Sequence, residues 1–208
     1  MVFTGAPDGS GNLITAFIGC HSGPLADGER ALKPVKEFGP PVMDLLQPMP
    51  YTTLQSMIDN EARAHVYWKA TFLSDFSAPV LDVIADSAQR LPTPLSSIIL
   101  EHFHGAMSRV PPEATAFSER QALFNVAVIG TTLDPAENDK CRAWARQVIS
   151  DLQPYSTGGV YVNYLGVGDE AERVRDAFGA NFQRLAQVKQ KYDPTNLFRA
   201  NQNIPPAK

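Results

Sequence analysis

Segments rich in β-branched and aromatic residues alternate with helix-like segments along the 208 residues of the chain. This alternation is the strongest restriction on the fold, because each kind of segment must bury an apolar face against another. The β-branched and aromatic content predicts five strands. They span residues 13–20, 65–72, 97–103, 121–131 and 159–165.

Helix patterns fill the intervening stretches, and turn residues such as Gly39-Pro40-Pro41 follow them. The predicted helices span residues 25–38, 52–60, 78–90 and 135–152. Asp134 precedes Pro135 as a suitable N-cap, and Ser77 has the same position before the helix at 78. Apolar residues at helical spacing give these segments one apolar face. The sequence therefore predicts an α+β fold, in which helices pack on one face of an antiparallel sheet.

Charge and hydrophobicity exclude several classes of protein. Hydrophobic residues make up 44% of the chain, enough for a substantial core, and the net charge is -4 without a long block of either sign. We therefore expect no binding to nucleic acid or to a membrane. Apolar runs are far shorter than the roughly 20 residues of a membrane helix. The first residues lack a signal-peptide pattern, which predicts a soluble cytoplasmic protein.

Metal and phosphate motifs are weak or absent in the sequence. His102 and His104 would share one face of a strand, but no acidic or cysteine partner motif follows them, so a plain strand is favoured over a metal site. Cys20 and Cys141 are too few for a disulfide framework and are predicted to be reduced. No glycine-rich dinucleotide motif follows a strand, and there is no P-loop lysine. The chain shows no phosphate cradle of its own.

The C-terminal run is the most specific motif of the sequence. Residues 188–206 read VKQKYDPTNLFRANQNIPP, and they follow Tyr161-Val162-Asn163-Tyr164 and Asn181-Phe182-Gln183-Arg184-Leu185 in that order. Together these segments resemble the end of the berberine bridge enzyme-like family of FAD-linked oxidases. The resemblance extends from about Gly19 to Pro206. It implies a substrate-binding cap domain at 1–178, related to ferredoxin-like folds, and a C-terminal berberine-like segment at 179–208 that would pack on a flavin domain.

Tyr164 is the catalytic residue that the resemblance implies, because several family members use a tyrosine there as the base for a substrate hydroxyl. A tyrosine with an ordinary pKa near 10 needs a neighbouring positive charge or hydrogen-bond donor to act at neutral pH. On the predicted strand, Tyr161 and Asn163 would face one way, and Val162 and Tyr164 the other. The alternative is a buried tyrosine whose hydroxyl is simply hydrogen-bonded.

Further site residues follow from the same resemblance. Tyr161, Val126 and Val128 are expected to bind the substrate, and the two valines, where plant members carry polar or acidic residues, predict a more apolar pocket. Four asparagines are expected to contact the flavin, or else to serve only in local turns. They are Asn163, Asn196, Asn201 and Asn203. Tyr192, Leu197, Phe198 and Ile204 would lack their usual cover, which predicts an exposed apolar patch, a partner chain or disorder beyond Tyr192.

Two functions are compatible with these features. The first is the substrate-binding portion of an FAD-dependent oxidoreductase that oxidises a small organic molecule by hydride transfer to flavin. Such a portion would not hold FAD alone and would be inactive without an FAD-binding domain, which would be either missing or a separate partner. The second is a free-standing domain that binds a ligand or a protein and has lost redox activity. A homodimer is expected as a way of covering the C-terminal tail.

Overall fold

The computed structural model describes residues 1–57, 63–166 and 171–208, and it divides the chain into two compact units. The larger unit combines Met1–Ala16 with Ala64–Lys208, and the smaller one is Phe17–Arg63. Residues 179–208 therefore belong to the same unit as the sheet. The predicted division at residue 178 concerns packing on a flavin domain and stays a prediction.

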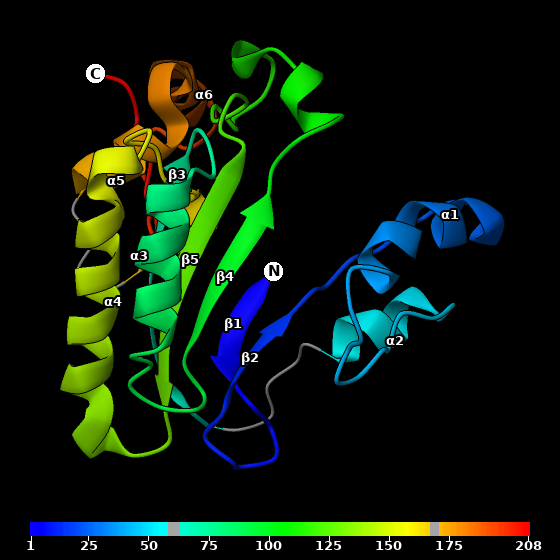
Figure 1. Ribbon diagram of the computed structural model, residues 1–208. Coiled ribbons are helices and arrows are strands. Elements are labelled where there is room, and N and C mark those ends of the chain that lie inside the picture. Colours follow the sequence, from blue (N-terminus) through cyan, green and yellow to red (C-terminus); the bar gives the residue numbers. More distant parts are fainter. Residues whose placement is uncertain (58–62, 167–170) are drawn as a thin grey trace. The chain divides into compact units, whose positions relative to one another are not determined.

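A five-stranded antiparallel sheet forms the centre of the larger unit (Figure 1). Its strands are β1 (Val2–Gly5), β2 (Leu13–Ala16), β3 (His65–Leu73), β4 (Ser97–His102) and β5 (Phe124–Thr132). They lie in the order β2-β1-β4-β5-β3. β5 pairs with β3 along all nine of its residues and with β4 along six. Its residues are nearly all buried, as expected for a strand with a neighbour on each side.

Two helices cover one face of this sheet, α3 (Ala78–Ala88) and α4 (Asn138–Leu152) (Figure 1). Their buried positions repeat at helical spacing: Val80, Ile84 and Ala88 in α3, and Cys141, Ala145, Val148 and Leu152 in α4. All of these side chains except Cys141 pack with Leu73, Ile98, Leu100, Val126 and Val128 of the strands in the main core. The predicted α+β fold, with helices on one face of an antiparallel sheet, is confirmed.

Helix starts follow the predicted caps in part. Asp134 accepts a hydrogen bond from the amide of Ala136 at 2.9 Å, at the start of the short 3-10 helix η3 (Pro135–Glu137) that leads into α4. The predicted helix 135–152 is therefore a 3-10 turn followed by an α-helix. Ser77 is the N-cap residue of α3, but its side chain makes no capping hydrogen bond.

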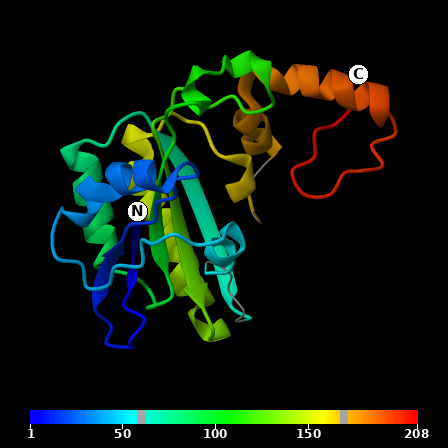
Figure 2. The same cartoon turned by 90° about the vertical axis from the view of Figure 1, so that its right-hand side faces the viewer.

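The C-terminal part of the chain is helical where no helix was predicted. α5 (Ala171–Phe178) and α6 (Phe182–Tyr192) flank the 3-10 helix η6 (Gly179–Asn181). In Figure 2 the red C-terminal segment loops back beside the orange α6, and the amide of Ala207 donates to the carbonyl of Ala186 at 3.0 Å. Gln202 donates to the carbonyl of Leu165 at 2.8 Å. The end of the chain is thus hydrogen-bonded to the larger unit.

The smaller unit contains α1 (Leu25–Lys36) and α2 (Tyr51–Ser56). Among its described residues, Gly28 alone is buried. Lys36 connects the end of α1 to the following loop by an ion pair with Asp44 at 3.1 Å and a hydrogen bond to the carbonyl of Leu46 at 2.9 Å. The predicted helix 52–60 is confirmed only through Ser56, because residues 58–60 lie outside the described residues.

Strand bounds differ from prediction mainly at the ends. The four-residue strand β1 was not predicted, and β2 ends at Ala16 instead of residue 20. The predicted strand 159–165 is wrong, as shown below. None of the described helices combines the length and apolarity that crossing a bilayer requires.

Candidate functional site

The segment around Tyr164 is a 3-10 helix, η5 (Val162–Tyr164), and not a strand. The amide of Tyr164 donates to the carbonyl of Tyr161 at 2.9 Å, which closes the turn. Backbone hydrogen bonds to β3 stop just before this point, where the amide of Phe72 donates to the carbonyl of Gly159. The expected alternation of Tyr161 and Tyr164 is therefore also wrong. In this turn, their rings contact each other edge to face, with centroids 5.9 Å apart.

Tyr164 is hydrogen-bonded to a carboxylate on the second face of the sheet, the face opposite α3 and α4. Its hydroxyl donates to Oε1 of Glu101 at 3.0 Å. The other oxygen of Glu101, Oε2, accepts from Nδ2 of Asn125 at 2.6 Å. Glu101 and Asn125 are directly opposite each other in the β4–β5 register, so both side chains leave the sheet on the same face. The structure thus brings together a tyrosine, a carboxylate and a fully buried amide.

The pKa of Tyr164 is raised well above its ordinary range. Burial is the largest cause, because it disfavours the phenolate, and the negative charge of Glu101 adds to it. This electrostatic setting is the opposite of the cationic neighbour that a tyrosinate base requires. Tyr164 is therefore a neutral hydroxyl that donates to Glu101, and a proton taken up by its oxygen can pass to the carboxylate.

Aromatic side chains surround the Tyr161 ring on the same side of the sheet. Phe72, Phe103 and Phe117 have ring centroids 6.5, 5.9 and 5.8 Å from that of Tyr161. Phe72 is fully buried, and it alternates along β3 with the core residue Leu73, so it lies on the second face. We call Phe72, Phe103, Phe117 and Tyr161 the aromatic wall. It gives the surroundings of Tyr164 a low polarity.

Arg120 holds one member of this wall in place. Its side chain is only 8% exposed, and its guanidinium lies 4.9 Å from the centroid of the Phe117 ring. It donates to the carbonyls of Phe117 and Met107, both at 3.2 Å, and also to the hydroxyl of Thr115. Five donors on a rigid planar group allow one arginine to fasten several loop segments at once. The irregular chain between β4 and β5 is organised in this way.

The structure places Val126 and Val128 away from this site. Both are fully buried in the main core under α3 and α4, with Leu100 and Ile98 opposite them in the register. Because side chains alternate along a strand, Asn125 and Ala127 are the β5 residues that face the site. The two valines thus lie on the face of β5 opposite the one that carries Asn125, and their predicted contact with a substrate stays a prediction.

The four asparagines assigned to flavin contact divide into two kinds. Asn163 and Asn201 are exposed. Asn196 and Asn203 each have a buried Oδ1 atom that finds no hydrogen-bond partner among the described residues. Asn196 adopts a left-handed backbone conformation with φ of 54° in the turn after Asp193. The turn chemistry expected as the alternative is present at Asn196, together with an unpaired acceptor.

These observations fit part of an FAD molecule. A buried amide oxygen without a donor suits a ring N–H of a flavin, and Asn196 and Asn203 both offer one. Two cavities in the described part of the chain have volumes of about 190 and 90 Å³, less than the few hundred Å³ of an ordinary ligand pocket. Neither of these two cavities is large enough to enclose FAD, and the buried oxygens of Asn196 and Asn203 would suit only one part of that molecule.

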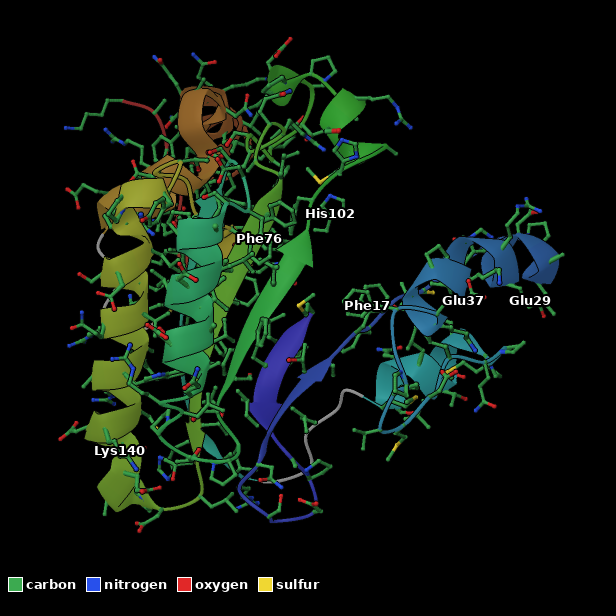
Figure 3. The ribbon with its side chains drawn as sticks, in the orientation of Figure 1. Phe17, Glu29, Glu37, Phe76, His102 and Lys140 are labelled. Atoms are coloured by element: carbon green, nitrogen blue, oxygen red, sulfur yellow. The ribbon has the colours of Figure 1, made fainter. Side chains whose placement is uncertain are left out.

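His102 and His104 stack on each other at the end of β4, with ring centroids 5.6 Å apart. His102 also stacks on Phe124 at 5.2 Å, and Phe124 contacts Phe76 at 5.3 Å; Figure 3 labels His102 and Phe76. Within residues 1–57, 63–166 and 171–208, no three potential ligands are grouped for a metal ion. Both cysteines are free, Cys20 exposed and Cys141 buried.

Glu101, Asn125 and the three phenylalanines of the aromatic wall were not predicted from the sequence. Glu101 is next to His102 in the sequence, and Asn125 is next to Val126. The sequence analysis considered both neighbours and gave no role to Glu101 or Asn125. The signal that identifies them is the strand register, which pairs positions 24 residues apart.

The chain is similar in sequence to a known protein family and to known FAD-linked oxidoreductases. The family described as "Berberine and berberine like" matches residues 160–205. An FAD-linked oxidoreductase of Dictyostelium discoideum is 28% identical over 89% of this chain and 41% of its own length. One from Bacillus subtilis is 30% identical over 82% of this chain and 37% of its own. The chain thus spans about two fifths of the length of these relatives.

Two solved structures have a similar fold. The structure of the berberine bridge enzyme-like protein 28 of Arabidopsis thaliana superimposes on 100% of this chain over 49% of its own length, with a TM-score of 0.70 and 19% identity. Phl p 4, a grass pollen allergen with glucose dehydrogenase activity, covers 68% of this chain and 33% of its own, with a TM-score of 0.60 and 25% identity.

The fold is that of the substrate-binding domain of FAD-linked oxidoreductases. By sequence, the chain is similar to the C-terminal part of FAD-linked oxidoreductases of the berberine bridge enzyme-like family, whose model matches residues 160–205. The resemblance that the sequence motifs indicated is confirmed.

Proposed function

We propose that this chain is the substrate-binding part of an FAD-dependent oxidoreductase that oxidises a small organic molecule bearing a hydroxyl group. The observation that carries the proposal is the hydrogen-bonded set of Tyr164, Glu101 and Asn125 beside the aromatic wall. A hydroxyl paired with a carboxylate, next to low-polarity aromatic rings, is suited to removing a proton from a bound alcohol.

The proton route has two steps within the chain. The substrate hydroxyl gives its proton to the oxygen of Tyr164, while the proton of Tyr164 moves to Oε1 of Glu101 over 3.0 Å. Tyr164 need not ionise in advance, which agrees with its raised pKa. Asn125 holds Glu101 in place from the other oxygen. Bound flavin would supply the acceptor for the hydride that leaves the substrate carbon.

Asn196 and Asn203 would hold the flavin from the side of the C-terminal segment, because their oxygens are buried acceptors without donors among the described residues. In this proposal a flavin domain supplies the rest of the FAD site and completes the enzyme. We expect the purified chain alone to be colourless, and stoichiometric flavin that survives dialysis would overturn this part of the proposal.

Reconstitution tests the proposal directly. We expect a mixture of this chain with the flavin domain of the Bacillus subtilis relative to reduce flavin anaerobically with some members of a panel of primary and secondary alcohols. Tyr164→Phe should lower the rate of flavin reduction by about 10²-fold or more, the usual contribution of general base catalysis. Tyr51→Phe is the matched control, since Tyr51 is 73% exposed, lies outside the C-terminal segment and should leave the rate unchanged.

Two results would contradict the proposal. One is a Tyr164→Phe mixture that reduces flavin at the normal rate. The other is a chain that binds aromatic ligands, with no flavin reduction in any mixture, which would favour the free-standing binding domain.

A further inference from the structure

Glu119 carries a carboxylate that has no partner in the described part of the chain. The side chain is half-buried, and its oxygens form no hydrogen bond or ion pair with a described residue. The guanidinium of the next residue, Arg120, binds three other groups of the loop between β4 and β5. Burial raises the pKa of Glu119, and no donor or positive charge offsets this effect. The carboxylate is therefore an acceptor without a donor.

The carboxylate lies where a side chain of residue 159 would be. A Cβ atom on Gly159 would overlap with the Oε1 and Cδ atoms of Glu119 and would lie 2.9 Å from its Oε2 atom. Glycine at this position therefore leaves the space that the carboxylate occupies. Gly159 is itself buried, so the carboxylate rests on packed backbone.

This position brings the carboxylate to the aromatic wall. Glu119 is two residues after Phe117, and Gly159 is two residues before Tyr161. The rings of Phe117 and Tyr161 are in contact, with centroids 5.8 Å apart, so the two short segments run side by side. Val160 is buried in a separate apolar cluster. Because side chains alternate along extended backbone, a side chain at 159 would leave on the side of Tyr161, and the Glu119 carboxylate fills that place.

A carboxylate beside aromatic rings has the chemistry to bind a protonated amine. An ammonium group offers three N–H donors, and its hydrogen bonds to a carboxylate are strengthened by both charges. The faces of aromatic rings also attract a cation within about 6 Å. The net charge of -4 favours the approach of a cation. A neutral ligand, in contrast, would leave the half-buried charge of Glu119 unpaired, which costs free energy.

We propose that Glu119 binds a protonated amino group of the substrate, and that the substrate class is therefore an amino alcohol. The inference rests on the proposed function, in which Tyr164 receives the hydroxyl proton of the same molecule. The Tyr161 ring contacts that of Tyr164, and two residues of extended chain, about 7 Å, separate Tyr161 from Gly159. A substrate with one benzene ring between its two polar groups would reach both side chains. Glu119 would thus determine specificity without taking part in the chemical step.

Calorimetric titration of the whole chain with two matched probes tests this role. The probes are 4-(aminomethyl)benzyl alcohol and 1,4-benzenedimethanol, in which a neutral hydroxyl replaces the ammonium group. We expect the amine to bind about tenfold more tightly or better, since a hydrogen bond to a charged group contributes that much. Glu119→Gln should remove this preference and leave the affinity for the neutral probe unchanged.

Two further variants separate the charge of Glu119 from its position. Gly159→Ala keeps the charge but displaces the carboxylate, so we expect it to weaken amine binding by about tenfold as well. Glu113→Gln is the matched control, because Glu113 lies in the same loop, is exposed and should keep the full preference. Circular dichroism establishes that each variant is folded.

The titrations need no flavin domain, so they test Glu119 separately from the oxidation. An amine preference that depends on Glu119, together with no flavin reduction in any mixture, would support the binding role and contradict the proposed function. Equal affinities for the two probes, no saturable binding of the amine, or a preference that survives in Glu119→Gln would overturn the inference.

Discussion

Glu101 receives hydrogen bonds from two side chains, and its charge acts on one of them. Because the pKa of Tyr164 is raised first by burial and then by Glu101, removing the carboxylate charge should lower that pKa part of the way towards its ordinary value. We expect Glu101→Gln to show this fall in an ultraviolet titration of the phenolate. Subtracting the titration of the Tyr164→Phe chain isolates the signal. An unchanged or higher Tyr164 pKa in Glu101→Gln would contradict the assigned cause.

Single residues at the site show how far the sequence leads. Tyr164 and Tyr161 were named from the resemblance, and their rings are in contact, while their roles stay predictions. Their mutual arrangement was not predictable, because the valine and tyrosines of this segment favour a strand, whereas the backbone turns into a 3-10 helix after its last hydrogen bond to the edge strand β3. Val126 and Val128 lie on the helix-covered face of β5, whereas the neighbouring Asn125 faces Tyr164, because successive residues of a strand point to opposite faces.

At the scale of elements, α4 packs directly against the backbone of β5 at Gly130, where no side chain separates them. A Cβ atom at Gly130 would lie 2.8 Å from both Cβ and the carbonyl oxygen of Cys141. We therefore expect Gly130→Ala to push α4 from the sheet and to lower the free energy of unfolding by about 1–3 kcal/mol, the usual cost of overpacking. Denaturant unfolding measures the change.

Gly39→Ala is the control for this prediction, since a Cβ atom there has no neighbour within 4 Å. We expect its effect to be within about 0.5 kcal/mol, as for an ordinary surface change. Equal effects of the two substitutions would show that the close approach of α4 at Gly130 does not matter.

The turn after α6 depends on one carboxylate. Asp193 forms an ion pair with Lys189 and accepts from the amides of Leu197 at 2.8 Å and Phe198 at 3.1 Å. The bond from Lys189 and those two amides lower the pKa of Asp193. A pKa lowered by folding contributes stability above the unfolded value of about 4, and this contribution is lost as the pH falls through the folded value.

We therefore expect amide hydrogen exchange at Leu197 and Phe198 to be faster in Asp193→Asn than in the unchanged chain at pH 7. The difference should shrink as the pH is lowered below about 4, where the unchanged chain also loses the charge. Gln187→Asn, on the exposed side of α6, is a suitable control. Equal exchange at pH 7 in the unchanged chain and in Asp193→Asn would contradict this role of the carboxylate.

Elements were predicted best where their pattern was long and self-contained. The apolar spacing of α3 and α4 and the β-branched run of β5 gave the layers correctly, because their burial depends on their own periodicity. β1 was missed, since four residues are too few for a pattern and the strand is defined by its pairing with β2 and β4. The hydrogen bond between Glu101 and Asn125 also arises from pairing, so no local pattern indicates it.

At the scale of the whole molecule, the two compact units differ in how much they bury. The larger unit contains the entire main core, whereas Gly28 is the sole buried residue described in Phe17–Arg63. We expect replacement of residues 17–63 by a Gly-Ser linker of about 15 residues to change the free energy of unfolding by less than about 1 kcal/mol. Thermal unfolding followed by circular dichroism tests this, with the same linker inserted at Gly39 in the full chain as the control. A large loss of stability in the shortened chain alone would show that the sheet depends on the smaller unit.

Exposed apolar residues near the C-terminus agree with one of the outcomes predicted for the tail. Tyr192, Leu197 and Phe198 are 74%, 73% and 78% exposed, whereas Ile204 is half-buried. The first three are exposed in this chain, and what covers them stays a prediction. The placement of Ile204 depends on the return of the chain towards α6, a tertiary contact that the motif does not encode locally.

The Oδ1 atoms of Asn196 and Asn203, which are buried without a hydrogen-bond donor among the described residues, make the melting temperature of this chain depend on ligands in the solution. Any molecule that donates hydrogen bonds to them binds the folded tail and not the unfolded one, so mass action raises the melting temperature as its concentration rises. A ligand at a hundredfold excess over its dissociation constant would add about 2.7 kcal/mol. Thermal-shift screening can therefore detect the missing donor without any assay of turnover.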